Sequence, residues 1–98
     1  MAEIRWTSQA AEDLDSIAAF IFQDSPHYAS LFVLQILKAV ERLDRFPESG
    51  RIVPETNNPN IREILLGNYR IVYRLKYSTA EILTIYHGSR LLYPDSLN

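Results

Sequence analysis

Two apolar stripes with helical spacing occupy the first half of this 98-residue chain, and one helix start signal separates them. The stripes run through residues 8–24 and 26–46, with apolar side chains recurring every three or four positions. Between them, Ser25 precedes Pro26, which is typical of an N-cap followed by the first position of a helix. Because so few residues join the two helices, the chain must fold back as an antiparallel helix hairpin.

Three extended segments make up most of the second half of the chain. Residues 61–66 and 69–76 flank Gly67-Asn68, a pair typical of a two-residue hairpin turn. Ser78-Thr79 is the next predicted turn, and residues 80–87 are expected to form the last strand. The sequence therefore predicts an α+β fold, with an N-terminal antiparallel helix hairpin packed on a small, mainly antiparallel β-sheet.

Length and composition bound the remaining possibilities. Residues 1–98 leave room for one hydrophobic core, so we expect a single domain. Residues 4–6 are expected to add a short strand, and residues 47–60, with three prolines and three asparagines, a long connecting loop. No membrane-spanning run, signal peptide or cysteine is present, so we expect a cytoplasmic protein without a membrane partner or a thiolate site.

The charge of the chain argues against a protein that coats nucleic acid. The formal net charge is −2, whereas phosphate binding depends on many lysine and arginine contacts. The acidic residues concentrate in the first half and the basic residues in the second. Most of these basic residues are arginine, which suits forked contacts to carboxylate or phosphate.

The two turns set the register, and the register predicts which side chains share a face. Leu65 should lie opposite Arg70, Arg74 opposite Leu83, and Arg70 opposite His87. The face toward the helix hairpin should carry Ile64, Leu66, Ile71, Tyr73, Leu75, Ile82 and Tyr86. The other face should carry Leu65, Arg70, Val72, Arg74, Lys76, Leu83, Ile85 and His87. This second face is apolar in its middle and cationic around it, which indicates that a partner covers it.

The predicted Arg70–His87 pair is the most specific chemical feature. Two cationic groups about 5 Å apart repel, unless the imidazole is neutral or an anion bridges them. The functional interpretation is an anion-binding patch of Arg70, Arg74 and His87, with Arg90 nearby. The structural interpretation is that Arg70 pairs with Glu63 and that His87 caps a strand end.

Other kinds of site have little support in the sequence. There is no glycine-rich phosphate loop, and the two histidines, His27 and His87, lie far apart, so neither a metal nor a cofactor is expected. Arg51 follows Gly50, where an arginine either steers a partner or braces its own loop.

Several short motifs together resemble the ParE/RelE superfamily of bacterial toxin–antitoxin toxins. They cover residues 4–92, and their order and spacing carry the resemblance. They are Trp6, Ala10-Ala11-Glu12-Asp13-Leu14, Ile17, Phe46-Pro47-Glu48-Ser49-Gly50-Arg51, Arg62-Glu63-Ile64, Tyr69 to Arg74, and Ile85-Tyr86-His87-Gly88-Ser89-Arg90. The resemblance implies a toxin of a type II system, with the same helix hairpin on an antiparallel sheet. It also implies a cognate antitoxin that wraps and neutralises the chain in a hetero-oligomer.

Two activities occur among proteins of this superfamily. ParE-like members inhibit DNA gyrase without being enzymes, whereas RelE-like members cleave messenger RNA on the ribosome. His87-Gly88-Ser89-Arg90, the acidic net charge and a 47–60 loop without lysine favour the ParE-like branch, associated with plasmid stabilisation. If the chain is instead an endoribonuclease, the resemblance makes Arg70, Arg74, His87 and Tyr93 the candidate catalytic residues.

The expected surface for the antitoxin or the target is arginine-rich. Its candidate residues are Arg51, Arg62, Arg70, Arg74, Ile85, His87 and Arg90. A third possibility is an inactive module whose only partner is the antitoxin.

Overall fold

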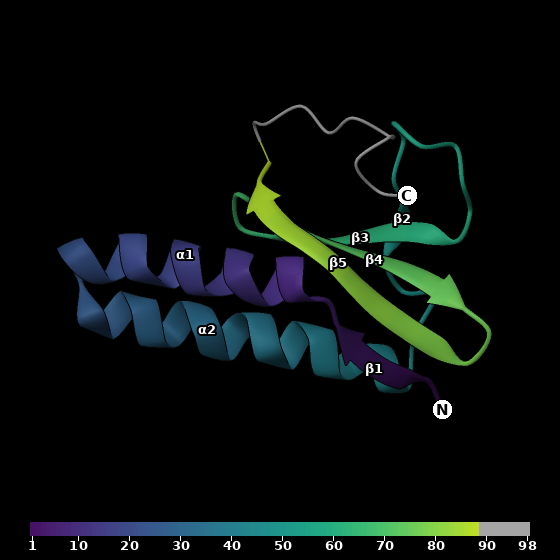
Figure 1. Cartoon of the computed structure of the whole chain (residues 1–98), viewed down its shortest axis with the longest axis horizontal. Coiled ribbons are helices and arrows are strands. Elements are labelled where there is room, and N and C mark those ends of the chain that lie inside the picture. Colours follow the sequence, from purple (N-terminus) through teal and green to yellow (C-terminus); the bar gives the residue numbers. More distant parts are fainter. Residues whose placement is uncertain (89–98) are drawn as a thin grey trace.

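A helix hairpin and a five-stranded sheet form the part of the chain that the computed structural model describes, residues 1–88 (Figure 1). The elements in chain order are β1 (Glu3–Trp6), α1 (Ser8–Asp24), α2 (Pro26–Glu41), the 3-10 helix η1 (Arg42–Asp44), β2 (Arg51–Ile52), β3 (Ile61–Leu66), β4 (Tyr69–Lys76) and β5 (Thr79–His87). Figure 1 shows the two helices side by side, with their connection beyond the end of the sheet.

Both helices begin at side-chain caps, α2 at the predicted Ser25 and α1 at Thr7. Thr7 Oγ1 accepts a hydrogen bond from the N–H of Ala10 at 3.1 Å, and Ser25 Oγ accepts one from the N–H of Tyr28 at 3.2 Å. α1 ends at Asp24 as expected, whereas α2 gives way to η1 after Glu41 and so stops short of residue 46.

The strands are ordered β1-β5-β4-β3-β2 across the sheet. β1 runs parallel to β5, and the other neighbours are antiparallel, so the predicted fold class is confirmed. β2 was not expected, because two residues inside a proline-rich connection give no alternating pattern. It pairs with Arg62 and Glu63 of β3.

The predicted register is right between β3 and β4 and wrong between β4 and β5. Leu66 pairs with Tyr69 and Leu65 with Arg70, across a turn in which Gly67 has a φ of 58°. The second turn is Tyr77-Ser78 instead of Ser78-Thr79, so Lys76 pairs with Thr79. Between the turn and Tyr73, this shift moves each pair by two positions along β5 and leaves the faces of the strand unchanged.

A β-bulge does change the faces. The register slips between Val72 and Tyr73, so one more residue of β5 is accommodated at this point. Beyond the slip, Ile71 pairs with Ile85 and Arg70 pairs with Tyr86. Ile85 therefore points toward the helices and Tyr86 away from them, the reverse of the prediction. The alternation of apolar residues in the sequence does not predict such a bulge.

Two apolar cores result, one on each side of the sheet. The core between hairpin and sheet contains Ala10, Ile36, Val40, Leu43, Ile71, Tyr73, Ala80, Ile82 and Ile85. The smaller core on the other face contains Val53, Ile61, Val72 and Tyr86, with Leu83 packed against them. The connection between β2 and β3 therefore contributes Val53 to the core that covers the second face. No helix within residues 1–88 has the length and apolar character needed to span a membrane.

Candidate functional site

Arg70 and His87 lie on opposite faces of the sheet, which corrects the predicted pair. His87 is opposite Tyr69, and their rings are 5.4 Å apart, with the Tyr69 ring 5.0 Å from Phe32 of α2. Arg70 is opposite Tyr86, and its guanidinium carbon lies 5.8 Å from the centre of that ring on the other face. An anion therefore has no position from which to bridge Arg70 and His87.

Arg70 is held by two carboxylates and a phenol. Its Nη1 donates to Glu55 Oε2 at 3.0 Å and to Tyr86 Oη at 3.1 Å, and it lies 3.3 Å from Glu63 Oε1. Burial alone would lower the pKa of Arg70, but its hydrogen bonds to Tyr86 and Glu55 and the charge of Glu63 raise it overall. The structural interpretation, in which Arg70 pairs with Glu63, is therefore confirmed.

Glu63 is the charged side chain that residues 1–88 bury most deeply. Its side chain is 0% exposed, and its Oε2 accepts from Arg51 Nε at 2.6 Å. Its Oε1 makes no hydrogen bond within the described residues and lies near Arg70 as an ion pair. Because a buried carboxylate is costly unless it is paired, the two arginines stabilise Glu63 in this position.

These contacts join Arg51, Glu55, Glu63, Arg70 and Tyr86 into one cluster, which we call the arginine–glutamate network. Two arginines and two glutamates cancel in charge, so the network presents no excess cation to a phosphate. Burial raises the pKa of Tyr86, although the hydrogen bond from Arg70 opposes that effect. The network braces β2, β3, β4 and the connection that carries Glu55.

Gly50 is required by the neighbouring Tyr73. The Tyr73 hydroxyl accepts from the N–H of Gly50 at 2.9 Å and donates to the carbonyl of Pro47 at 2.7 Å. A Cβ at residue 50 would lie 2.6 Å from the Tyr73 hydroxyl and 2.8 Å from the carbonyl oxygen of Glu63. The Phe-Pro-x-x-Gly-Arg motif thus places a glycine against a buried tyrosine and Arg51 against Glu63.

The remaining predicted arginines within residues 1–88 also have partners in the chain. Arg62 donates to the backbone carbonyls of Glu48, Gly50 and Pro59, and so it braces the connection before β3. Arg74 is opposite Glu81, not Leu83, and its Nη2 lies 2.5 Å from Glu81 Oε1.

Ile85 does not belong to an exposed binding surface, because it is 2% exposed and lies in the core beneath the helices. The sequence placed it on the partner face through the mistaken register. Arg90 and Tyr93 lie outside the described residues. The predicted site therefore divides into a charge network on one face and His87 on the other.

Sequence reasoning missed Glu55 and Tyr86. Glu55 lies in the irregular connection, where no periodicity indicates a direction, and Tyr86 had been assigned to the helix side. Glu63 had been named as a possible partner of Arg70 because it is a nearby carboxylate, and the alternation of β3, which puts residues 63 and 65 on one face, agrees with that pairing.

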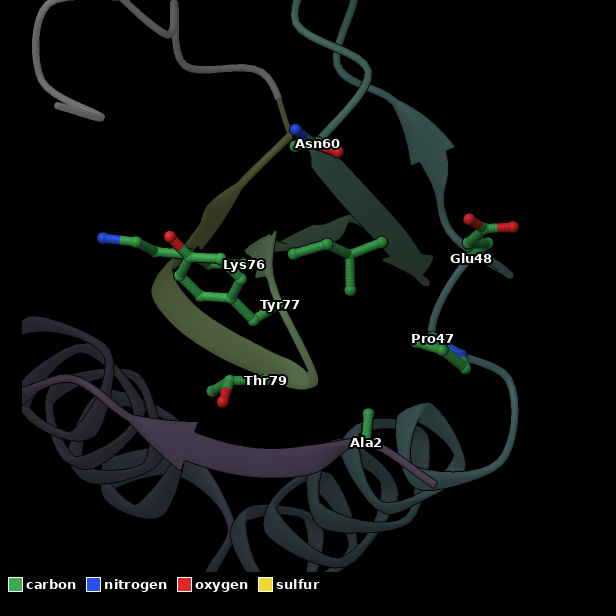
Figure 2. A pocket seen from close by; sticks show the side chains of 8 residues that line it. Ala2, Pro47, Glu48, Asn60, Lys76, Tyr77 and Thr79 are labelled. Atoms are coloured by element: carbon green, nitrogen blue, oxygen red, sulfur yellow. The ribbon is translucent and has the colours of Figure 1, made fainter.

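A separate hollow lies beside the β4–β5 turn. Figure 2 shows Lys76, Tyr77 and Thr79 on one side of it, with Pro47 and Glu48 across from them. It contains none of the predicted site residues. Within residues 1–88, no three histidine, cysteine or carboxylate side chains come together as a metal site.

Comparison with known proteins defines the class to which this fold belongs. The model of the ParE toxin of the type II toxin–antitoxin system parDE matches residues 4–92. A putative toxin, Y4kP of Sinorhizobium fredii, is 40% identical over 87 residues, covering 87% of this chain and 86% of the relative. Toxin RelE2 of Caulobacter vibrioides is 34% identical over 92 residues, covering 93% of this chain and the whole relative.

Solved structures agree with this classification. The chromosomal ParDE toxin–antitoxin system of P. aeruginosa includes a chain with a TM-score of 0.73 and 28% identity, covering 89% of this chain and 96% of its own. A chain of the RelBE2 toxin–antitoxin complex of Mycobacterium tuberculosis has the same fold, with a TM-score of 0.62 and 21% identity over 88% of this chain and 96% of its own. The chain belongs to the ParE toxin family, as the sequence motifs predicted.

Proposed function

We propose that this toxin inhibits DNA gyrase without cleaving RNA, and that a cognate antitoxin binds and silences it. Gyrase as the target follows from the resemblance to the ParE-like branch. The family match over residues 4–92 supports this branch. Action on gyrase and control by an antitoxin both place the protein in the cytoplasm.

The neutralisation of Arg70 is the observation that carries the proposal. Cleavage of RNA requires a cation for the scissile phosphate and a proton donor or acceptor within reach of the same atoms. Arg70 is instead paired with Glu55 and Glu63, and Arg74 is paired with Glu81. His87 lies across the sheet from Arg70. Three of the four candidate catalytic residues therefore do not converge, and Tyr93 lies outside the described residues.

An antitoxin partner is supported by the structural neighbours and by the surface of the chain. The neighbours come from a ParDE system and a RelBE2 toxin–antitoxin complex. On this chain, Phe22 of α1 and Leu34 of α2 are each more than half exposed and line one apolar hollow with Ala18, Ala19, Ala29 and Val33. Large apolar side chains exposed in this way favour a protein that is covered by a partner.

A supercoiling assay tests the proposal directly. Purified chain is incubated with DNA gyrase, ATP and relaxed plasmid, and primer extension on translated messenger RNA is run in parallel. We expect loss of supercoiling that increases with the amount of chain, with no new RNA ends. Addition of the protein encoded beside this chain should restore supercoiling.

Two results would overturn the proposal. New RNA ends within translated codons, with supercoiling unchanged, would show that the chain is a ribosome-dependent endonuclease. The primer-extension measurement is essential because one relative carries the name RelE2. If cells that express the chain without antitoxin grow normally, and neither supercoiling nor RNA is affected, the chain is an inactive module that only binds the antitoxin.

A further inference from the structure

The outer edge of the sheet at β3 is only half covered. β2 has two residues, which pair with Arg62 and Glu63, and the N–H of Val53 then donates to the carbonyl of Ile61 at 3.0 Å. No strand within residues 1–88 lies beyond the second half of β3. The uncovered part is the stretch from Ile64 to Leu66.

Leu65 directs its backbone groups to this uncovered edge. Backbone N–H and C=O groups alternate in direction along a strand, and the carbonyl of Ile61 points outward to Val53. Residues 61, 63 and 65 therefore face the edge, while Ile64 and Leu66 bond to β4. Leu65 is 53% exposed, and no strand within residues 1–88 pairs with its outward N–H and C=O. Such an edge is a template for an additional strand.

A groove runs along this edge between β3 and α2. It consists of two adjoining hollows that share Ala39 and Arg42. The first is otherwise lined by Ser49, Gly50, Arg51, Glu63, Ile64 and Leu65. The second continues along Phe32, Gln35, Lys38, Leu66, Gly67, Asn68 and Tyr69.

The charges of the groove define the chemistry of its occupant. Lys38 and Arg42 are exposed and form no ion pair within residues 1–88. Glu63 is the carboxylate among the lining residues, and it is buried and already paired with Arg51 and Arg70. The groove is therefore cationic, with an apolar leucine and unpaired backbone at its edge.

We propose that this edge binds an acidic, extended segment of the antitoxin as an added strand. The segment's backbone pairs with the N–H and C=O of Leu65, and its carboxylates face Lys38 and Arg42. Backbone pairing provides affinity in this mode, and the side chains provide specificity. The identity of the partner rests on the proposed function. A second copy of this chain is a poorer occupant, because it would bring two sets of the same cations together.

Hydrogen exchange at one amide is the most direct test. The full-length chain is labelled with 15N and compared alone and in complex with the full-length protein encoded beside it. We expect the Leu65 amide to exchange rapidly in the chain alone and about 100-fold or more slowly in the complex. The Ile64 amide, which bonds to β4, should be slow in both states and serves as the internal control.

Charge reversal tests the role of the cations. The double variant Lys38→Glu/Arg42→Glu should weaken binding of the same partner at least about tenfold. The matched control is Arg45→Glu/Lys76→Glu, which changes two exposed cations outside the groove by the same total charge and should alter Kd less than about twofold. Equal losses in both double variants would show a general charge effect and would contradict the proposal.

Proline substitution tests the backbone contact. Leu65→Pro removes the outward N–H and leaves the β3–β4 hydrogen bonds in place, whereas Leu65→Ala keeps the N–H and removes the side chain. We expect the proline variant to bind more weakly than the alanine variant, with similar thermal unfolding. Equal binding by the two variants would argue against an added strand. If the proline variant unfolds early, the Leu65 exchange measurement decides.

The outcomes separate this proposal from the proposed function. A complex that leaves the Leu65 amide unprotected overturns the edge site and leaves the toxin proposal standing. Absence of any complex with the neighbouring protein overturns the antitoxin partner itself. In the chain alone, the Leu65 amide could become protected from exchange as the protein concentration rises. If sedimentation then also shows dimers, the edge binds a second copy of the chain.

Discussion

The carboxylate of Asp13 on α1 accepts a hydrogen bond from Thr84 of β5. The Thr84 hydroxyl donates to Asp13 Oδ2 at 2.5 Å, and the N–H of Ile85 donates to the same oxygen at 3.1 Å. These bonds lie beside the register slip that places Ile85 in the main core and Tyr86 on the other face. A helix side chain thus satisfies a backbone N–H on the edge of β5 that β1 does not reach, because β1 pairs only with residues 79–82.

Removal of this carboxylate should destabilise the fold. We expect Asp13→Ala to lower the free energy of unfolding by about 1–3 kcal/mol, because it leaves the Thr84 hydroxyl and the Ile85 N–H without an acceptor. Urea unfolding followed by circular dichroism measures the change. Asp15→Ala, which removes an exposed carboxylate from the same helix, is the control and should change stability by less than about 0.5 kcal/mol. Equal effects in the two variants would contradict a specific role for Asp13.

Gly50→Ala should be destabilising despite its small size. The added methyl group would contact the Tyr73 hydroxyl and the Glu63 carbonyl at distances that require the backbone to move. We expect a loss of about 1–3 kcal/mol in the free energy of unfolding, as for an overpacked core. The exposed neighbour provides the control, since Ser49→Ala should be close to neutral. A Gly50→Ala chain as stable as the parent would mean that the approach of Tyr73 is looser than the structure indicates.

Glu63→Gln should lower the free energy of unfolding more than the same substitution at Glu81, whose ion pair is partly exposed. Loss of the charge leaves Arg51 and Arg70 without their shared buried partner, so we expect a loss of about 3 kcal/mol. Glu81→Gln, which weakens the more exposed ion pair with Arg74, should cost less than about 1 kcal/mol. Thermal or urea unfolding of both variants at neutral pH checks the difference. If the two losses are similar, the arginine–glutamate network is not the buried brace described above.

Stability should fall in alkaline solution through two tyrosines. Burial raises the pKa of Tyr73 and of Tyr86 above the ordinary 10.0. The folded chain therefore keeps protons that the unfolded chain loses. The stabilising contribution is complete below about pH 10 and is lost as the pH rises through the raised pKa values.

Urea unfolding at about pH 8 and about pH 11 measures this loss. Tyr73→Phe should reduce the difference in unfolding free energy between the two pH values, because the substituted ring cannot ionise. Tyr77→Phe is the control, since Tyr77 is 98% exposed and should leave the difference unchanged. Identical pH dependence in the parent and the Tyr73→Phe chain would contradict the assignment.

Local signals determined the elements of this fold. The caps at Thr7 and Ser25, the helical spacing of the apolar residues, and the Gly67-Asn68 turn each act over a few residues. These signals were sufficient to predict the helix hairpin, β3 and β4 with their register, and most of the main core. The order of the short motifs was sufficient for the toxin family.

The candidate site was predicted less well, because its geometry depends on contacts between distant residues. Arg70 and Glu63 were recognised as a possible pair, and they do pair. Arg51 was expected to steer a partner or to brace its own loop, and its pairing with Glu63 was not predicted. The proposed neighbour of Arg70, His87, lies on the other face because of a bulge that alternation does not reveal.

The sequence by itself determined the class of fold and the family, since these depend on short-range patterns. Only the tertiary structure decided which face Ile85, Tyr86 and His87 occupy. Asp13 is 71 residues from Thr84 in the chain, and it supplies the acceptor beside the bulge. A one-residue slip reverses every later side chain of a strand, so the bulge, which no local pattern encodes, decides which residues share a surface.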